Sequence, residues 1–574
     1  MKVADIVARF LAEQKVKHVF CVSGGASLHL IHGIAKAEGI TYVCPQNEQA
    51  ASFAADSYAR CNGIGAALAT SGPGATNLVT GIAASYYDSV PVVYLTGNQT
   101  RARLGEGLNV RQFGFQATPI VDMVKPVTKY AVTVMEPEAI LYELERAVHI
   151  AMSGRPGPVL LDIPDDVQRA EVDIAALRHY CPVVHHDPYE QYALGEVASE
   201  VMDELQDARR PLLIYGYGVR HYRREAEVLA RSLGIPLVVT WGARDLFPAA
   251  VGGFGTHGIR AANFAVQNAD YVLAIGTRLD TKATGSPAES FAPKARLVMV
   301  DIDDFEIAKM SRIGRSLHRG IVADAGDFLR QMVRIAQSVE CNAWLSGIAG
   351  WLERYPAILP SYAAEQINPY ILVRELAKHC EATDTIVSDT GCALGWMMQA
   401  YPFKGERFIH AFNQTPMGYG LPAALGAAFA TGGRVVLVTG DGGLAVNITE
   451  FATIARHRLP IKIVLFNNRG HGMCRQTQRQ WLGGEYPSTS FDGGLACPDY
   501  AAVARAYGLE TYSTAHGDVA GRFMAQMMES GGPALLEVNI AEDAGIAPQA
   551  KWGHKLEDQE PLLPREELAE VMSL

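Results

Sequence analysis

The residues from Arg434 to Asn468 contain two short apolar, β-branched runs, and each run ends in polar residues. The first run ends in Gly440-Asp441-Gly442, and the second ends in Asn467-Asn468. The 24 residues between them, 443–466, are enough for a turn, a helix and a returning strand, so this segment predicts one βαβ unit. The carboxyl ends of both strands then lie at one edge of a parallel sheet, which brings the Asp441 carboxylate close to the Asn468 amide.

Oxygen ligands beside a glycine-rich helix N-terminus suit a Mg²⁺ ion that holds a diphosphate. In such sites Mg²⁺ is coordinated by phosphate oxygens of the bound molecule as well as by protein oxygens, and helix N-termini attract anions. Gly-Asp-Gly alone is also ordinary turn chemistry after a strand. The Asn467-Asn468 pair favours a ligand site, because amide side chains are uncommon at a buried strand end without a partner.

Composition limits the class of protein. The 574 residues, 49% of them apolar, predict three or four domains of about 150 residues with sizeable cores. No apolar run approaches the roughly 20 residues that a membrane span needs, and the first residues form an amphipathic helix, so neither a membrane protein nor a signal peptide is expected. The net charge of −11 without a basic tract argues against a nucleic-acid partner. Nine cysteines without a metal-type spacing indicate reduced thiols in a cytoplasmic protein.

Three successive patterns of alternating strand and helix predict an α/β protein with three doubly wound parallel-sheet domains. The patterns cover residues 1–175, 190–340 and 365–545. A polar stretch at residues 181–192, CPVVHHDPYEQY, is typical of a linker between the first two. We expect residues 546–574 to form a polar C-terminal tail that is docked by Trp552 and a few apolar residues.

The GDG…NN spacing is that of thiamine diphosphate (ThDP) enzymes, and the chain resembles their acetohydroxyacid synthase-like family over nearly its full length. The resemblance implies a pyrimidine-binding domain, a central domain and a diphosphate-binding domain, in that order. It also implies that the first and third domains share a topology and pair across a homodimer or homotetramer. The Mg²⁺ ligands implied are Asp441, Asn468 and Gly470.

Glu48 lies in the segment NEQAASFAADSYAR, which resembles the segment that carries the family's catalytic glutamate. Taken alone, Glu48 is a first-turn glutamate that complements a helix dipole. The resemblance implies that its protonated carboxyl binds the aminopyrimidine ring of ThDP, a role that suits a buried carboxyl with a raised pKa. Asn47 stands where histidine is frequent in the family, which leaves the local proton relay open.

Further residues match the family's cofactor contacts. Met417 precedes a Gly-rich turn; such a methionine is usually core filler, but the resemblance makes it the wedge that bends ThDP. The resemblance also places Gly25 and Gln116 at the reacting carbon. Implied cofactor-binding residues are Gly24, Gly72, Gly74, Asn77, Gly418, Gly440, Gly442 and Gly443.

The central pattern resembles segments that hold FAD in acetohydroxyacid synthases. The implied FAD-binding residues are Arg155, Gly255, His257, Arg278 and Asp301. The alternative is a central domain that keeps the fold and binds nothing. Such a flavin would be structural, because decarboxylation and ligation need no electron transfer.

Together these features predict a ThDP- and Mg²⁺-dependent carboligase. It would decarboxylate a 2-oxo acid, pyruvate in the first instance, and transfer the acyl unit to an aldehyde, ketone or second 2-oxo acid. The rivals are a 2-oxo acid decarboxylase without ligation and a non-catalytic homologue. Thr477 stands where the biosynthetic synthase has a tryptophan, and this region looks more like homologues from surface-polysaccharide and secondary-metabolite clusters. The sequence leaves the acceptor unnamed.

Overall fold

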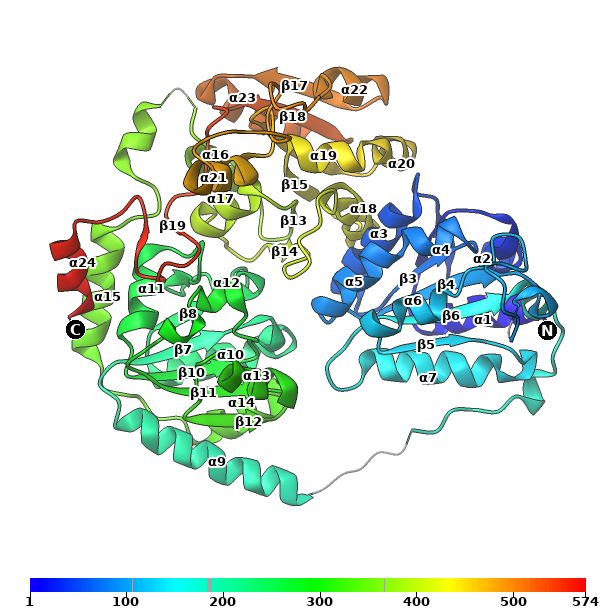
Figure 1. The fold of residues 1–574 in the computed structure, drawn as a ribbon, viewed down its shortest axis with the longest axis horizontal. Helices are drawn as coiled ribbons and strands as arrows, with labels where there is room; N and C mark the ends of the chain where they lie inside the picture. Colours follow the sequence, from blue (N-terminus) through cyan, green and yellow to red (C-terminus); the bar gives the residue numbers. More distant parts are fainter. Residues whose placement is uncertain (106, 183–187, 366, 574) are drawn as a thin grey trace.

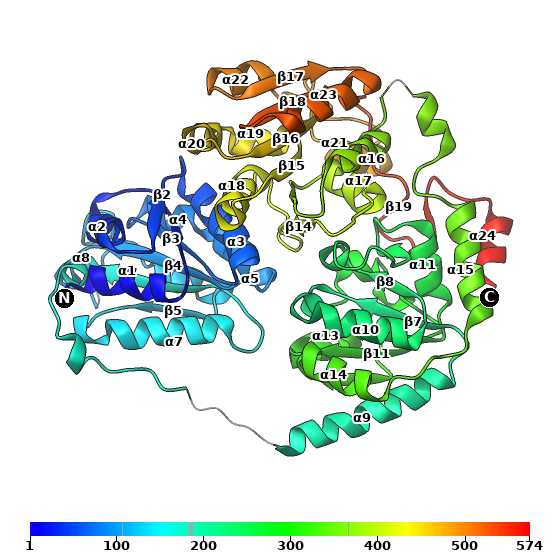
Figure 2. The same cartoon turned by 180° about the vertical axis from the view of Figure 1, so that it is seen from behind.

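The computed structural model describes residues 1–105, 107–182, 188–365 and 367–573, which form three α/β domains (Figure 1). Each domain holds one six-stranded, all-parallel sheet flanked by helices, which confirms the predicted fold class. Seen from the front and from behind, the first and central domains lie on opposite sides and the third lies against both (Figures 1 and 2). Within these ranges we find no helix with the length and apolar content needed to cross a bilayer. Residues 183–187 of the predicted linker lie outside the described residues.

The first domain has the strand order β2-β1-β3-β4-β6-β5. Its strands are β1 His18–Cys21, β2 Thr41–Val43, β3 Gly65–Ala69, β4 Val92–Asn98, β5 Tyr130–Thr133 and β6 Val159–Pro164. Its helices are α1 Val3–Glu13, α2 Leu28–Lys36, α3 Glu48–Asn62, α4 Pro73–Asn77, α5 Val79–Tyr87, α6 Ile120–Val124, α7 Ile140–Met152 and α8 Asp165–Gln168. The apolar stripe of α1 is buried in this domain's core, as its periodicity predicts.

The third domain repeats this topology, with the order β14-β13-β15-β16-β18-β17. Its strands are β13 Thr385–Ser388, β14 Arg407–Ile409, β15 Val435–Gly440, β16 Ile461–Asn467, β17 Glu510–Thr514 and β18 Ala534–Asn539. Its helices are α16 Pro369–His379, α17 Cys392–Ala400, α18 Gly420–Thr431, α19 Asp441–Val446, α20 Phe451–His457, α21 Gly472–Trp481, α22 Tyr500–Ala506 and α23 Gly517–Glu529. Strands β15 and β16 pair in parallel through Gly440 and Phe466, which confirms the predicted βαβ unit.

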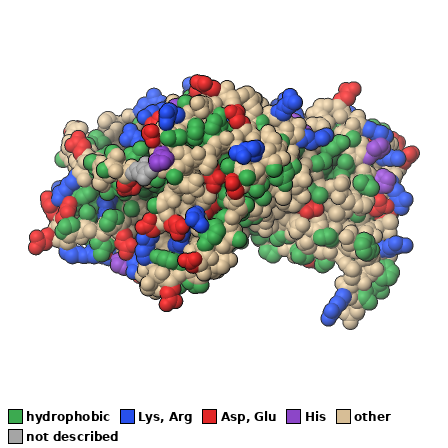
Figure 3. All heavy atoms as spheres, turned by 90° about the horizontal axis from the view of Figure 1, so that it is seen from above, with side chains coloured by type: hydrophobic (Ala, Val, Ile, Leu, Met, Phe, Trp, Pro, Cys, Tyr) green, Lys and Arg blue, Asp and Glu red, His purple; other side chains and the backbone are tan. Residues whose placement is uncertain are grey.

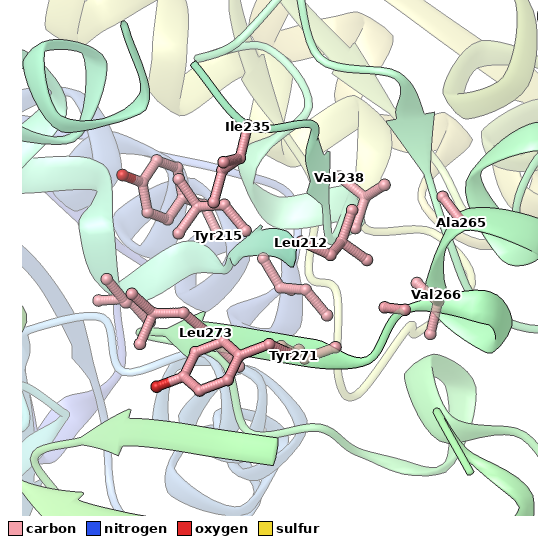
Figure 4. Packing of buried hydrophobic residues seen from close by; sticks show 14 of the residues in the cluster. Leu212, Tyr215, Ile235, Val238, Ala265, Val266, Tyr271 and Leu273 are labelled. Carbon is pink, nitrogen blue, oxygen red and sulfur yellow. The ribbon is translucent and has the colours of Figure 1, made fainter. Parts of the chain in front are cut away.

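The central sheet has the order β12-β11-β10-β7-β8-β9, the Rossmann order when counted from the other end. Its strands are β7 Pro211–Tyr215, β8 Leu237–Val239, β9 Gly252–Gly253, β10 Tyr271–Ile275, β11 Arg296–Asp301 and β12 Arg319–Val322. Its helices are α9 Pro188–Gln206, α10 Arg223–Leu233, α11 Arg260–Asn268, α12 Thr281–Thr284, α13 Asp304–Arg312, α14 Ala325–Ile335 and α15 Asn342–Arg354. The inner strands β7 and β10 are buried on both faces, so their side chains are apolar or aromatic. Leu212 lies on the same face of the sheet as Val238, and Leu273 lies on the other face (Figure 4).

Helices α3 and α18 join the first and third domains. The Ser57 hydroxyl donates a hydrogen bond to the Ala423 carbonyl (2.7 Å), and the Tyr419 hydroxyl donates one to Asp56 (2.6 Å). A Cβ atom on Gly426 would lie 2.0 Å from the Ala54 carbonyl oxygen, so only glycine permits this approach. The small residues of both helices therefore allow the first and third domains to pack closely.

The C-terminal tail packs on the central domain, with strands β19 Gln549–Ala550 and β20 Gln559–Glu560 and helix α24 Arg565–Met572. Leu556 and Val571 are buried in the central core, and Asn268 donates a hydrogen bond to the Val571 carbonyl. The prediction that Trp552 docks the tail is wrong, because this side chain is 60% exposed. The tail is held instead by apolar side chains such as Leu556 and by polar contacts such as the Arg354–Glu567 ion pair (2.8 Å).

Candidate active site

Glu48 begins helix α3 at the carboxyl edge of the first sheet. Asn47 is the N-cap, and its side-chain oxygen accepts a hydrogen bond from the Ala50 amide (2.8 Å). The Glu48 carboxylate accepts a hydrogen bond from the Asn77 side chain (2.9 Å), so two of the predicted residues are in contact. The side chain is only half-buried in the single chain, so the expected burial of Glu48 is not found there.

Of the predicted glycines in this domain, Gly74 lies against Glu48, and the others form neighbouring turns. A Cβ atom on Gly74 would lie 3.3 Å from the Glu48 carboxylate, and one on Gly24 would lie 2.4 Å from Thr70. Gly25 follows β1 and has open space where a Cβ atom would stand. Gly24 follows β1 and Gly72 follows β3, so these turns flank the point where the strand order reverses.

Gln116 lies against the Gly72 turn. Gly72 has a φ of +62°, and a Cβ atom there would lie 2.9 Å from the Gln116 side chain. Gln116 itself has a φ of +58°, an uncommon conformation for a residue other than glycine. Backbone strain of this kind is found at ligand sites more often than elsewhere.

Asp441 lies at the corresponding edge of the third sheet, directly after β15. Its two carboxylate oxygens accept hydrogen bonds from the Gly442 and Gly470 amides, both at 2.8 Å. The side chain is buried, and burial raises the pKa of its carboxyl. A cation at this position would favour the ionised carboxylate.

The Asn468 and Gly470 oxygens converge beside Asp441. The Asn468 side-chain oxygen lies 2.8 Å from the Gly470 carbonyl oxygen, so two acceptors face each other without a donor between them. Rotating the amide would turn this contact into a hydrogen bond, whereas a cation would be bound by both oxygens as they stand. One carboxylate, one amide oxygen and one carbonyl are ligands that Mg²⁺ accepts, so the residues present fit this metal.

Asp389 is a residue of this site that the sequence reasoning missed. It follows β13, is fully buried, and its carboxylate accepts hydrogen bonds from the Gly418 and Gly420 amides (3.2 and 2.9 Å). Burial raises the pKa of its carboxyl to about 6. It also packs against Gly443, so it fixes two of the predicted glycine turns to each other. An acidic residue at the end of a predicted parallel strand was the signal available for it.

Met417 and His471 lie over the turn that follows β15. A Cβ atom on Gly442 would lie 2.6 Å from the His471 ring and 3.0 Å from the Met417 methyl group. Met417 is 38% exposed, which is unusual for core filler and leaves its side chain open to a ligand. Gly440, the last residue of β15, has no neighbouring atom within 4 Å of an added Cβ.

Asn447 connects the two groups of residues within one chain. Its side chain donates a hydrogen bond to the Gly418 carbonyl (2.8 Å) and accepts one from Asn47 (3.0 Å). Glu450, one turn later, accepts a hydrogen bond from the Gln46 amide (2.7 Å). The structure thus places the start of α3 against the rim of the Asp441 site.

A cavity of about 970 Å³ lies where all three domains meet. Four of the five predicted FAD-binding residues line it: Arg155, His257, Arg278 and Asp301. Gly255 lies next to the lining residues Phe254 and Thr256. The volume is at the upper end of the range for cofactor sites.

The two arginines of this cavity are already engaged in ion pairs, and two further polar groups are buried there. Arg155 pairs with Asp303 (2.9 Å), and Arg278 pairs with Glu306 (2.9 Å). Among the described residues, nothing hydrogen-bonds the buried Nε2 atom of His257, whose pKa burial lowers to about 4. Burial also raises the pKa of Asp301, to about 6. An unpartnered buried ring nitrogen is the feature that a bound ligand would satisfy.

Comparison with known domain families gives one match for each domain. The family described as "Thiamine pyrophosphate enzyme, N-terminal TPP binding domain" matches residues 1–122, and its "central domain" matches residues 198–332. The "C-terminal TPP binding domain" matches residues 389–538. The matches follow the order of the three sheets.

Proteins of the same overall length are also similar. An acetolactate synthase large subunit from Parasynechococcus marenigrum is 34% identical over 95% of this chain and 88% of its own length. An acetolactate synthase from Arthrospira platensis is 33% identical, with 96% of both chains covered. Acetolactate synthase isozyme 1 large subunit from Escherichia coli is 31% identical, again with 96% of both covered.

Proposed function

Because the chain belongs to the acetolactate synthase family of thiamine diphosphate enzymes, we propose that it is a carboligase. It would decarboxylate a 2-oxo acid, pyruvate in the first instance, and join the remaining acyl unit to a second carbonyl compound. The observation that carries this proposal is the convergence of the Asp441, Asn468 and Gly470 oxygens at one sheet edge. A non-catalytic homologue has no need for such a set.

Each predicted residue has a task that its position supports. Asp441, Asn468 and the Gly470 carbonyl would hold Mg²⁺, and through it the diphosphate of the cofactor. ThDP bound there would supply the electron sink that decarboxylation requires. Glu48 would hold a proton at the aminopyrimidine ring nitrogen, where Asn77 orients its carboxyl. Met417 would support the cofactor from the side of Gly442.

The central cavity would hold FAD as a structural group. Arg155 and Arg278 would face its diphosphate, and Asp301, at the end of β11, suits ribose hydroxyls. The Nε2 atom of His257 would form a hydrogen bond with the ligand. The alternative is a cavity that binds nothing. Oxidised flavins absorb near 450 nm, so absorbance of the purified protein at this wavelength would support bound FAD, and its absence would support the empty cavity.

The catalytic unit would be a homodimer or a homotetramer. Leu108, Val110, Phe113 and Phe115, which precede Gln116, are each more than half exposed. A cluster of exposed apolar side chains beside a site favours cover by a second chain. The face seen from above bears acidic and basic side chains interspersed with apolar ones, which is compatible with contact between copies (Figure 3).

Thr477 bears on which carbonyl compound the enzyme would use as its acceptor. Thr477 lies on α21, is exposed, and donates a hydrogen bond to the Met473 carbonyl (3.2 Å). A threonine where relatives carry an indole leaves more room on the acceptor side, so we expect use of aldehydes or ketones bulkier than a 2-oxo acid.

The test is incubation with pyruvate and a panel of aldehydes, ketones, 2-oxo acids and nucleotide keto-sugars, with products identified by mass spectrometry. A new carbon–carbon bond in any product supports the carboligase. Release of acetaldehyde alone supports the decarboxylase, and no consumption of pyruvate or of other 2-oxo acids supports the non-catalytic homologue. Thr477→Trp should narrow the acceptor range, and an unchanged range would remove Thr477 from the acceptor site.

A further inference from the structure

Two cysteines stand side by side at the ends of neighbouring strands in the first domain. Strands β1 and β2 pair in parallel with Phe20 opposite Val43, and Cys21 and Cys44 each directly follow this pair, Cys21 within β1 and Cys44 just beyond the end of β2. Phe20 and Val43 both point into the core shared with the third domain. Because side chains alternate along a strand, Cys21 points to the other face of the sheet, into the separate core of the first domain, and the same alternation continued beyond Val43 would direct Cys44 to that face.

The distance between these strands suits a disulfide. Neighbouring strands lie about 4.8 Å apart, within the range of roughly 4.4–6.8 Å that disulfides require between Cα atoms. The two thiols lie close enough for each to shift the pKa of the other. Cys44 lies one residue beyond the end of β2, so its backbone is free of the sheet ladder and can adjust.

We propose that Cys21 and Cys44 form a reversible dithiol–disulfide pair that changes the position of Glu48. Cys21 stands three residues before Gly24, and Cys44 stands four residues before Glu48. A covalent link between the strand ends would therefore act on both turns that approach the reacting carbon in the proposed function. The disulfide itself does not depend on that function.

The two thiols differ in exposure and in pKa, as thiol–disulfide exchange requires of an attacking and a resolving thiol. Cys44 is exposed and Cys21 is buried. The hydrogen bond from Cys21 lowers the pKa of the Cys44 thiol to about 6, and Arg456 acts in the same direction while burial opposes both. The same hydrogen bond, with burial, raises the pKa of Cys21. Cys44 is then the attacking thiolate at neutral pH, and Cys21 is the resolving thiol.

The oxidant we infer is a low-molecular-weight disulfide of the glutathione type. The Cys44 thiolate attacks one of its sulfurs, forms a mixed disulfide and releases one thiolate. Cys21 then loses its proton and attacks the Cys44 sulfur, forming the protein disulfide and releasing the second thiol. Two protein thiols and one small disulfide give one protein disulfide and two small thiols, so electrons and atoms balance.

Peptide mapping tests the pair in the intact protein. After treatment with oxidised glutathione and alkylation of free thiols, trypsin without reduction should release peptides 18–36 and 37–60 as one linked species, because each contains a single cysteine. Cys21→Ala should leave glutathione on Cys44. The proposal fails if wild-type Cys44 keeps glutathione without forming the link, or if the exposed control thiol Cys181 reacts while Cys44 does not.

Turnover of pyruvate tests the effect on Glu48. Oxidation should lower turnover by about tenfold or more, because small displacements of a catalytic group are costly, and dithiothreitol should restore it. Cys44→Ser should turn over pyruvate like the reduced wild type and resist the oxidant. A linked species with unchanged turnover would overturn the proposed control of Glu48. An enzyme that consumes neither pyruvate nor any other 2-oxo acid contradicts the proposed function instead, and the peptide map then decides on the disulfide.

Discussion

Glu48 and Asp441 are carboxylates in different surroundings, and each surrounding suits its proposed task. Asp441 is buried and accepts two backbone hydrogen bonds at fixed positions, so a cation would find its ligands already ordered. Glu48 is half-buried with one amide partner, Asn77, which leaves the rest of its carboxyl for a ligand. The spacing of Asp441 and Asn468 at two strand ends predicted the metal site from the residues, whereas Glu48 was predicted only through the resemblance of its segment to the family. Asp389 also follows a predicted strand, but its carboxylate accepts hydrogen bonds from backbone amides, so no partner side chain in the sequence marked it as part of the site.

Replacing Glu48 by glutamine should leave ThDP binding intact and lower turnover. Glutamine keeps the size and the hydrogen bond to Asn77 but holds no transferable proton, so the loss should be about 10²–10⁴-fold in kcat. Steady-state kinetics and the amount of bound ThDP would be measured side by side. Glu38→Gln, at an exposed glutamate, is the matched control. Near wild-type turnover in Glu48→Gln would remove Glu48 from the mechanism.

Replacing Asp441 by alanine should abolish retention of ThDP, because the diphosphate loses its bridging cation. Treatment of the wild type with EDTA should have the same effect, and added Mg²⁺ should reverse it. The measurement is the ThDP that remains with the protein after gel filtration. Asp492→Ala, at an exposed aspartate, controls for loss of charge. Tight binding of ThDP by metal-free enzyme would contradict the assigned ligands.

At the scale of elements, each candidate site lies where the strand order of a sheet reverses. Gly24 and Gly72 flank this point in the first sheet, Asp389 and Asp441 flank it in the third, and the central cavity lies beside the ends of β7 and β10. The positions of all three candidate sites thus follow one topological rule.

The sequence predicted the inner strands and missed most edge strands. Strands such as β4 and β10 are fully buried and give continuous apolar runs. Strands β5, β9, β12, β14 and β17 lie at sheet edges, and they are short or partly exposed. Their patterns are mixed because one side meets solvent, so they resemble loops in the sequence.

Replacing Gly426 by alanine should destabilise the contact between α3 and α18. The added methyl group would meet the Ala54 carbonyl, and overpacking of this kind costs about 1–3 kcal/mol. Gly347→Ala in α15 is the matched control; it has open space for a methyl group and should be neutral or stabilising by up to about 1 kcal/mol. Thermal or urea unfolding would compare the two. Equal stability of both variants would mean that the helices can separate without cost.

Glu450 should make the stability of the same boundary depend on pH. Burial raises the pKa of its carboxyl from 4.5 to about 7 in the folded protein. The stability it contributes is therefore full below about pH 4.5 and is lost as the pH rises toward 7. Glu450→Gln cannot ionise, so its melting temperature should rise relative to the wild type between pH 5 and about 8. A constant difference across this range would show that Glu450 does not titrate there.

At the scale of the whole molecule, one chain carries both halves of the proposed site on different domains. Glu48 lies on the first domain and Asp441 on the third, and the two domains have the same topology. A two-fold axis would let the first domain of each chain face the third domain of the other and give two equal sites. Sequence alone could not decide this, because the same residues would serve a site within one chain or between two.

Mixing two inactive variants decides between these arrangements. Glu48→Gln and Asp441→Ala would be produced together with different affinity tags, and the mixed dimers would be isolated through both tags. If a site takes Glu48 from one chain and Asp441 from the other, each mixed dimer has one site with both residues intact and one with neither. A randomly mixed population should then recover about a quarter of wild-type turnover, and the purified mixed dimer about half. If each site lies within one chain, every site of the mixed dimer has one defect and no turnover returns. A fully active monomer would contradict the shared site altogether, because a single chain would then supply all of its residues.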